Sequence, residues 1–357
     1  MTKTARAATL YGALQRLPYV KTAPEILEMR FWRHTMKERA IADPIRRTKN
    51  QTDRLINYHL LKLASITSHV ANKFPALRTL HPFEHEVVVL TLGPGAYEKQ
   101  LQHLRKVYAS LHKCGKAFET ENKTVRTQVE STDIMARCLE ALQDVVFDQA
   151  PVLKDTAEMA KTLRKLPEID LEKPLFALVG SPNVGKSSLV KALTTANPEI
   201  ANYPFTTRGV TIGHIFIHGI SYQVADTPGL LCRPDHERNA IEKLALSILT
   251  KTKATVGFVV DPTGSSGTPL AEQLALRDEL RAKLPEKAAT TWIDLVSKTD
   301  VSFDRSILTP AHEALLATML PVSTHTNEGL AAVDASVRAM LQTAASTDDD
   351  VGKTSSN

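Results

Sequence analysis

One stretch of the chain, residues 175–188, limits the possible folds more than any other. Five apolar residues lead into Gly180, and Gly185, Lys186 and Ser187 follow at the spacing of a phosphate-binding loop. Glycines let the backbone N–H groups approach a phosphate, and the next helix adds its positive dipole end. We expect Lys186 to bridge the β- and γ-phosphates and the Ser187 hydroxyl to bind Mg²⁺. The predicted phosphate-binding residues of this stretch are Asn183, Val184, Gly185, Lys186, Ser187 and Ser188.

Two later segments contain the residues that a triphosphate and its Mg²⁺ ion require. Asp226 ends a predicted strand, where its carboxylate can hold the Mg²⁺ water shell, and the Gly229 N–H can meet a γ-phosphate. Either Thr206 or Thr207 is expected to bring a hydroxyl to Mg²⁺ from a switch segment, and we favour Thr207. The predicted switch residues are Thr206, Thr207, Asp226, Thr227, Pro228, Gly229 and Leu230.

The segment Ser297-Lys298-Thr299-Asp300 follows an apolar strand pattern and predicts the choice of base. The Asp300 carboxylate is placed to accept hydrogen bonds from the N1 and N2 donors of guanine, a pattern that adenine does not offer. The Lys298 stem can lie over the base, and a Ser-Thr pair after a later apolar segment can complete the pocket through its backbone. We therefore expect GTP rather than ATP. The predicted guanine-binding residues are Ser297, Lys298, Asp300, Ser323 and Thr324.

Hydrophobic periodicity divides the chain of 357 residues into a helical part and an α/β part. Residues 18–166 have apolar side chains at helical spacing almost throughout, which predicts an N-terminal all-α antiparallel helical bundle. In residues 167–343, strand and helix patterns alternate, which predicts an α/β P-loop domain whose mostly parallel sheet is flanked by helices. Residues 344–357 are polar and are expected to be disordered.

The charge of the chain is concentrated in its first part. Residues 1–150 hold 23 Lys and Arg against 15 Asp and Glu, whereas the whole chain has a net charge of only +5. The densest basic tract, residues 30–54, is either a surface for RNA phosphates or an ordinary solvated helix face, and both interpretations stay open. The RNA-binding candidates are Arg46, Arg47, Lys49 and Arg54.

Composition also bears on the compartment. Three scattered cysteines favour a reducing compartment. Residues 1–17 are basic and contain no acid, which suits either a mitochondrial transit peptide or a plain basic tail. No apolar run approaches the roughly 18 residues of a membrane span, so we expect no membrane partner. We also expect no DNA partner.

Several motifs resemble one family. Asn-Val-Gly-Lys-Ser-Ser, Tyr-Pro-Phe-Thr-Thr, Asp-Thr-Pro-Gly-Leu-Leu and Arg238-Asn239-Ala240-Ile241-Glu242 look like the Obg-type GTPases, and most of all like the nucleolar GTP-binding protein 1 family. His81-Pro82-Phe83 and the helix from Tyr97 onward are similar to that family's N-terminal bundle, so the resemblance covers roughly residues 17–341. It implies assembly of the large ribosomal subunit, with the helical domain on ribosomal RNA.

Three departures bear on mechanism. Leu230 stands where Ras-like enzymes have the water-positioning Gln, so unaided hydrolysis should be slow. Asn183 resembles the phosphate-loop Asn of potassium-stimulated relatives, although it can equally be a cap of the loop. Ser297 replaces the usual Asn, and its shorter side chain is expected to lose contacts to the base and the phosphate loop, at about 0.5–1.5 kcal/mol for one neutral hydrogen bond.

These observations lead to a slow GTPase that assembles the large ribosomal subunit as a monomer, with rRNA, ribosomal proteins or other assembly factors as partners. Its cofactors would be Mg²⁺ and, if Asn183 acts as in its relatives, K⁺. The family's long lysine-rich C-terminal extension is not expected here, and with the basic leader this favours the mitochondrial matrix over the cytoplasm or nucleolus. Two alternatives are a structural GTP-binding module that does not hydrolyse GTP, and a GTPase acting on another RNA, such as tRNA, or on a membrane.

Overall fold

The computed structural model describes residues 12–36, 41–194, 198–206, 209–303 and 308–354, with side chains described as far as residue 346. Its helices and strands are, in chain order, α1 (Ala23–Leu27), η1 (Arg30–Arg33), α2 (Pro44–Ile66), α3 (Ser68–Ala71), η2 (Leu77–Thr79), α4 (Pro82–Leu92), α5 (Ala96–Thr124), α6 (Gln128–Asp148), α7 (Ala150–Arg164), β1 (Leu175–Val179), α8 (Lys186–Leu193), β2 (Glu199–Ala201), β3 (Val210–Ile217), β4 (Ile220–Asp226), η3 (Asp235–Glu237), α9 (Ala240–Lys251), β5 (Ala254–Val260), α10 (Leu270–Lys283), α11 (Pro285–Thr290), β6 (Trp292–Val296), α12 (Pro310–Ala317), β7 (Leu320–Pro321) and α13 (Leu330–Thr354).

The chain forms two compact units. The helical unit comprises residues 1–81 and 92–165, and the second unit, which we call the GTPase unit, comprises residues 82–91 and 166–357. None of the helices that the structure describes has the length and apolar character needed to cross a membrane.

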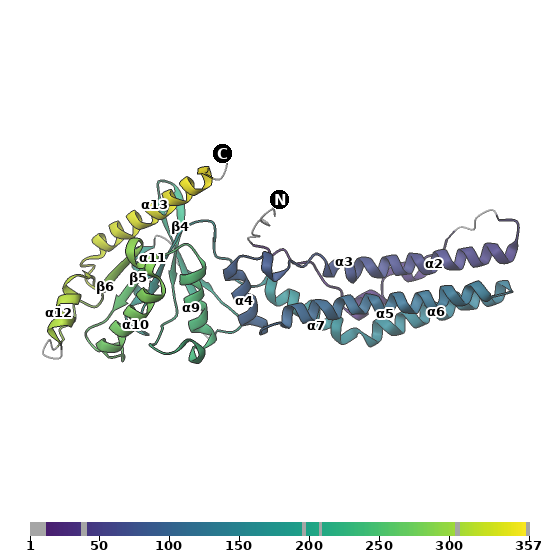
Figure 1. Ribbon diagram of the computed structural model, residues 1–357, viewed down its shortest axis with the longest axis horizontal. Coiled ribbons are helices and arrows are strands. Elements are labelled where there is room, and N and C mark those ends of the chain that lie inside the picture. The colour runs from purple at the N-terminus through teal and green to yellow at the C-terminus, as the bar shows by residue number, and fades with distance from the viewer. Residues whose placement is uncertain (1–11, 37–40, 195–197, 207–208, 304–307, 355–357) are drawn as a thin grey trace, which may run out of the picture. The chain divides into compact units, whose positions relative to one another are not determined.

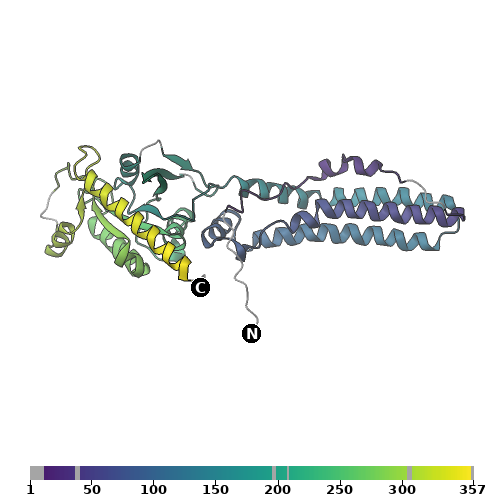
Figure 2. The same cartoon turned by 90° about the horizontal axis from the view of Figure 1, so that it is seen from above.

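Long helices lying side by side build the helical unit (Figures 1 and 2). Helices α2, α5 and α6 pack on one another around buried side chains such as Ile56, Leu104 and Leu142. A polar network also joins them, because Asn122 donates to Asp53 Oδ1 at 2.8 Å and accepts from the Ser131 hydroxyl at 2.7 Å. Buried amides and hydroxyls that are paired in this way fix the register of the helices as well as their contact.

A seven-stranded sheet in the order β2-β3-β4-β1-β5-β6-β7 forms the centre of the GTPase unit. Strand β1 runs parallel to β4 and β5, and β5, β6 and β7 continue the parallel order, whereas β3 is antiparallel to β2 and β4. Helices α8 and α13 cover one face, where Val190 and Val337 join the core of the sheet. Helices α9 and α10 pack against β5 from the other side (Figure 1). The expected fold class, an N-terminal helical domain followed by an α/β P-loop domain, is confirmed.

Two sequence-based boundaries differ from the structure, and a third falls largely outside the described residues. The expected bundle, residues 18–166, includes α4, but this helix belongs to the GTPase unit, where Glu86 accepts from Lys251 at 2.5 Å. The sequence predicts disorder from residue 344 onward. This prediction is wrong as far as Thr354, because α13 continues to that residue. Residues 1–11 of the expected leader lie outside the described residues, but Leu14 and Leu17 are buried, so the end of that segment is packed.

Candidate nucleotide site

The backbone conformation at two glycines, Gly180 and Gly185, sets the shape of the phosphate loop. All five residues of β1 are buried, and the chain leaves this strand at Gly180, whose φ is +148°. A Cβ on Gly180 would lie 2.4 Å from the Val259 carbonyl oxygen, so no larger residue fits. Gly185 is the N-cap of α8 with φ +100°, a left-handed conformation that favours glycine. The loop therefore ends with the N–H groups of α8 facing the space where an anion can bind.

Lys186 lies buried inside the curve of this loop. Its ammonium donates to the carbonyl oxygens of Gly180, at 3.0 Å, and Ser181, at 2.6 Å. Burial lowers the pKa of Lys186 to about 8, and the nearby Asp226 carboxylate opposes this shift. A triphosphate would supply the negative charge that the two neutral carbonyls do not.

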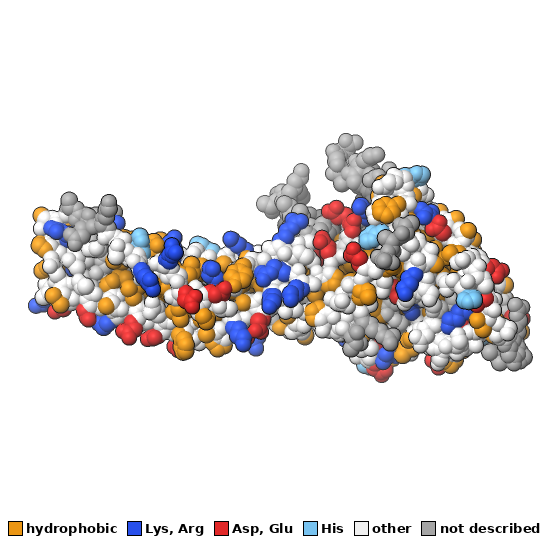
Figure 3. All heavy atoms as spheres, turned by 180° about the vertical axis from the view of Figure 1, so that it is seen from behind, with side chains coloured by type: hydrophobic (Ala, Val, Ile, Leu, Met, Phe, Trp, Pro, Cys, Tyr) orange, Lys and Arg blue, Asp and Glu red, His pale blue; other side chains and the backbone are white. Residues whose placement is uncertain are grey.

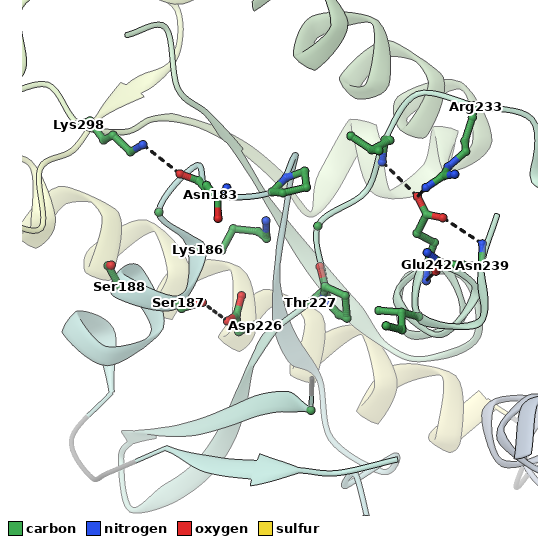
Figure 4. A pocket seen from close by; sticks show the side chains of 17 residues that line it. Asn183, Lys186, Ser187, Ser188, Asp226, Thr227, Arg233, Asn239, Glu242 and Lys298 are labelled. Carbon is green, nitrogen blue, oxygen red and sulfur yellow. Dashed lines mark hydrogen bonds and ion pairs between the residues drawn. The ribbon is translucent and has the colours of Figure 1, made fainter. Parts of the chain in front are cut away.

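Next to it, the Ser187 hydroxyl donates to the Asp226 carboxylate (Figure 4). Burial raises the pKa of Asp226, whereas the Ser187 hydrogen bond and Lys186 act in the opposite direction. One hydroxyl and one carboxylate suit Mg²⁺, which binds few protein oxygens and takes its other ligands from water and phosphate. Of the two threonines considered for this ion, Thr207 lies outside the described residues, and the Thr206 hydroxyl donates to the Tyr203 carbonyl at 2.9 Å.

The segment after Asp226 is fastened to β1 and to the phosphate loop. The Thr227 hydroxyl donates to the Leu178 carbonyl at 2.8 Å, and the Leu230 N–H donates to the Gly180 carbonyl at 3.1 Å. A Cβ on Gly229 would lie 2.7 Å from the backbone of Pro182, so glycine alone allows this approach. The Leu230 side chain is fully buried. This side chain has no hydrogen-bonding group and is not exposed, so it cannot position a water molecule.

Hydrogen bonds and ion pairs at the start of α9, which the sequence did not reveal, hold the residues that follow the switch segment. Glu242, which is 3% exposed at its side chain, accepts from Arg233 Nη2 at 2.9 Å and from the Asn239 N–H at 3.0 Å (Figure 4). The buried Arg238 donates to Glu279 at 2.5 Å. The motif containing these residues carried the family resemblance but no assigned role. Its signal was an Asn and a Glu three residues apart, which is a capping box at the start of α9.

On the side where the base is expected, Ser323 donates to Asp300 Oδ1 at 2.6 Å, and this hydrogen bond lowers the pKa of Asp300. Lys298 donates to the Asn183 carbonyl at 2.9 Å and to Asp261 Oδ2 at 2.7 Å. Asp261 is fully buried and was missed, although it directly follows the apolar strand β5. Thr324 lies beside Ser323 in the loop after β7.

The expected loss of contact between Ser297 and the phosphate loop is wrong. The Ser297 hydroxyl donates to the Val184 carbonyl of the loop at 2.7 Å, with the Val260 carbonyl as a second acceptor at 3.1 Å. The shorter side chain reaches because β6 delivers Ser297 next to Gly185, where a Cβ would lie 3.8 Å from that of Ser297. The serine therefore ties the base side of the site to its phosphate side.

Together these segments line a cavity of about 610 Å³, whose walls come from the phosphate loop, the end of β4 and the start of α9 (Figure 4). The cavity-lining residues among those predicted are Asn183, Gly185, Lys186, Ser187, Ser188, Asp226, Thr227, Pro228, Gly229 and Lys298. The structure thus brings most of the predicted phosphate and switch residues to one place, although Val184, Thr206 and Leu230 do not line the cavity. Of the predicted guanine-binding residues only Lys298 lines it, and Ser297, Asp300, Ser323 and Thr324 do not.

The four RNA-binding candidates lie along α2, on the helical unit. Lys49 donates to the carbonyl oxygens of Lys123, at 2.7 Å, and Val125, at 3.1 Å, and Arg47 donates to the Ile41 carbonyl at 3.0 Å. Arg46 is exposed and Arg54 is half-buried. Two of the four candidates, Arg47 and Lys49, therefore donate hydrogen bonds to the backbone of the helical unit. On the face drawn in Figure 3, Lys and Arg side chains are interspersed with apolar and acidic ones.

Comparison with known proteins agrees with this two-part construction. A family model described as the NOG1 N-terminal helical domain matches residues 14–170, and one described as a 50S ribosome-binding GTPase matches residues 175–296. The chain is 28% identical over 240 residues to nucleolar GTP-binding protein 1 of Encephalitozoon cuniculi, and 27% identical over 339 residues to the probable nucleolar GTP-binding protein 1 of Dictyostelium discoideum.

These matches take in 67% and 90% of the chain but only 45% and 49% of the two relatives. An uncharacterised protein of Methanocaldococcus jannaschii is 31% identical over 65% of each chain. The chain thus spans about half the length of the nucleolar relatives.

Proposed function

The chain belongs to the nucleolar GTP-binding protein 1 family of P-loop GTPases, and from this premise we propose that it is a slow GTPase acting in assembly of the large ribosomal subunit. The observation that carries the GTPase part is the cavity where Lys186, Ser187, Asp226 and Gly229 converge. The ribosomal part is supported by the matching family, which is described as a 50S ribosome-binding GTPase.

In the proposed mechanism, Lys186 and the N–H groups of the loop stabilise the charge on the phosphates of GTP. Ser187 and Asp226 would hold Mg²⁺, which neutralises charge on the β- and γ-phosphates. The Gly229 N–H reports the γ-phosphate to the switch segment. Because Leu230 is buried and apolar, it cannot position the attacking water. We therefore expect turnover to stay low until a ribosomal partner, or K⁺ held by Asn183, completes the site.

Asp300 would select guanine. The Ser323 hydroxyl already donates to one of its oxygens, which fixes the orientation of the carboxylate. A carboxylate held in this way favours a base with two adjacent donors, which guanine has and adenine lacks. Guanine specificity is therefore part of the proposal.

The excess of basic residues in the first 150 residues supports rRNA as the partner of the helical unit, with ribosomal proteins or other assembly factors nearby. The names of the relatives agree with the nucleolar alternative for the compartment. A mitochondrial version of the function depends on a leader that lies largely in residues 1–11, and imaging of the tagged full chain tests it.

The proposal is tested by GTP turnover of the full chain, with and without K⁺, and with and without purified large-subunit rRNA. We expect low basal turnover that K⁺, rRNA or both increase, and no turnover in Lys186→Ala. Absence of turnover in every condition would favour the structural GTP-binding module instead. Stimulation by tRNA but not by large-subunit rRNA would favour a GTPase acting on another RNA.

A further inference from the structure

A groove of about 470 Å³ lies on the helical unit, between η1 and α2. We call it the η1–α2 groove and define it by Arg30, Arg33, His34, Tyr58 and Lys62, all of which line it. It is separate from the nucleotide cavity, and none of its residues is among the RNA-binding candidates that the sequence suggested.

Aromatic rings form one wall of the groove. The exposed His34 ring stacks on the ring of Tyr58, with centroids 4.1 Å apart and planes inclined by 25°. Beneath Tyr58 lies the buried His59, whose ring stacks on Trp32 at 5.8 Å. The Trp32 indole donates to the Ile26 carbonyl at 2.8 Å, which fixes this layer to the core of the unit. Tyr58 meets the His59 ring edge to face, with centroids 5.4 Å apart, so the stacked His34–Tyr58 pair rests on a layer of buried rings.

His59 is an unusual member of this stack. Neither of its ring nitrogens has a hydrogen-bond partner within the described part of the chain, and the side chain is fully buried. Burial lowers the pKa of His59 to about 4, so the ring is neutral at physiological pH. It acts as a flat, uncharged support, and the positive charge of the groove comes from its rim.

Three cations make that rim. Arg30, Arg33 and Lys62 are exposed, and no carboxylate among the described residues pairs with any of them. The Lys62 ammonium lies 5.5 Å from the centre of the Tyr58 ring. By contrast, Arg137 of the same unit is paired with both Glu121 and Asp133. The cations of the groove are therefore available to an anionic ligand.

A flat aromatic surface next to unpaired cations is the chemistry that binds an unpaired nucleotide. Bases stack on aromatic side chains, and Arg and Lys hold the adjoining phosphates. A regular duplex keeps its bases stacked on one another and offers none to a side chain. We propose that the η1–α2 groove binds one unpaired RNA nucleotide, with its base on His34 and its phosphates at Arg30, Arg33 and Lys62. This inference rests on the proposed function, since it names the part of the helical unit that contacts rRNA.

The hydrogen bonds of these cations also bear on the basic tract of residues 30–54. Arg47 and Lys49 donate to backbone carbonyls of their own unit, whereas no residue that the structure describes accepts a hydrogen bond from Arg30, Arg33 or Lys62. The structure therefore directs the search for an RNA contact away from the start of α2 and towards η1 and the later part of α2.

The test uses the full chain and two labelled RNAs, a single strand and a duplex, with binding followed by fluorescence anisotropy at several salt concentrations. His34→Ala removes an exposed ring, and we expect about tenfold weaker binding of the single strand with an unchanged salt slope. Duplex binding should not change. Combined Arg30→Gln, Arg33→Gln and Lys62→Gln should weaken binding and reduce the magnitude of the salt slope by about 2.

Lys99→Gln, Lys106→Gln and Lys113→Gln in one chain form the matched control, because they remove three exposed positive charges from α5 of the same unit. GTP affinity and the circular dichroism spectrum should be unchanged in every variant. If the control weakens the single strand as much as the groove variant does, or His34→Ala has no effect, the proposal is overturned.

Sedimentation of the same variants with large ribosomal subunits separates this inference from the proposed function. If the wild-type chain sediments with the subunit and the groove variants do so equally well, the groove proposal fails and the proposed function stands. If the wild-type chain does not sediment with the subunit, the proposed function fails, and the groove proposal fails with it. Cross-linking of the groove to a ribosomal protein instead of RNA would also overturn it.

Discussion

Two lysines of the GTPase unit have similarly lowered pKa values, although Lys186 is buried and Lys287 is half-buried. Lys186 donates to two backbone carbonyls of the phosphate loop, and Lys287 donates to the carbonyls of Thr252 and Ala254, each at 2.9 Å. Burial lowers the pKa of both ammonium groups to about 8. By pKa alone, the two residues could not be told apart.

Their surroundings differ. Lys186 lines a cavity that also contains a hydroxyl, a carboxylate and a glycine N–H, whereas Lys287 joins the end of α9 to the start of β5 and is not among the residues that line this cavity. A perturbed pKa therefore identifies burial, and the neighbouring groups decide whether the buried charge serves a ligand or the fold.

The largest expected difference between the two lysines is in GTP binding. Lys186→Ala should lower GTP affinity by at least about 100-fold, because two charge-assisted hydrogen bonds to phosphate, each about 1.5–3 kcal/mol, are lost. Lys287→Ala should change GTP affinity less than about twofold. Titration calorimetry with GTP and Mg²⁺ measures both. A fall of less than about tenfold in Lys186→Ala would contradict the assignment of the loop.

The second difference concerns stability and pH. Lys287 has a pKa of about 8 in the folded chain against 10.5 as the ordinary value, so between these pH values the unfolded chain binds more protons. The free energy of unfolding should therefore rise with pH in this window, by at most about 3 kcal/mol. Lys287→Met removes this contribution, which urea denaturation at pH 7.5 and pH 10 can detect. A variant with the same pH dependence as the wild type would show that the ammonium is not desolvated.

The smallest effect concerns a third group that donates to a backbone carbonyl, the Ser297 hydroxyl on Val184. Ser297→Ala leaves that carbonyl without its donor, and we expect GTP affinity to fall by about 2- to 10-fold, from a loss of about 0.5–1.5 kcal/mol. Ser336→Ala, at an exposed hydroxyl of α13, is the control and should have no effect. Unchanged affinity in Ser297→Ala would mean that the loop keeps its geometry without this tie.

Local patterns predicted what lies within one stretch of chain. The strand, the loop with its two glycines and helix α8 follow one another directly, so spacing and composition sufficed. The alternation of strands and helices likewise predicted the α/β class, because parallel strands need helical crossovers.

These patterns could not predict contacts between segments that are distant in the sequence. Ser297 meets Val184 and Lys298 meets Asp261 only because β1, β5 and β6 lie side by side, and no periodicity specifies such a pairing. The same holds for the stack of His34 on Tyr58, which requires η1 to fold back on α2. Helix α4 was misassigned for a related reason, since an apolar periodicity shows which face is buried but not against which unit.

The proposed function predicts that the nucleotide state of the GTPase unit, which Gly229 reports to the switch segment, controls how tightly the chain holds the large ribosomal subunit. The most direct measurement is the affinity of the full chain for purified large subunits, with a non-hydrolysable GTP analogue and with GDP. Coupling of this kind is typically about 1–3 kcal/mol, so we predict at least a fivefold difference between the two states, absent in Lys186→Ala. Equal affinities in the two nucleotide states would contradict the account.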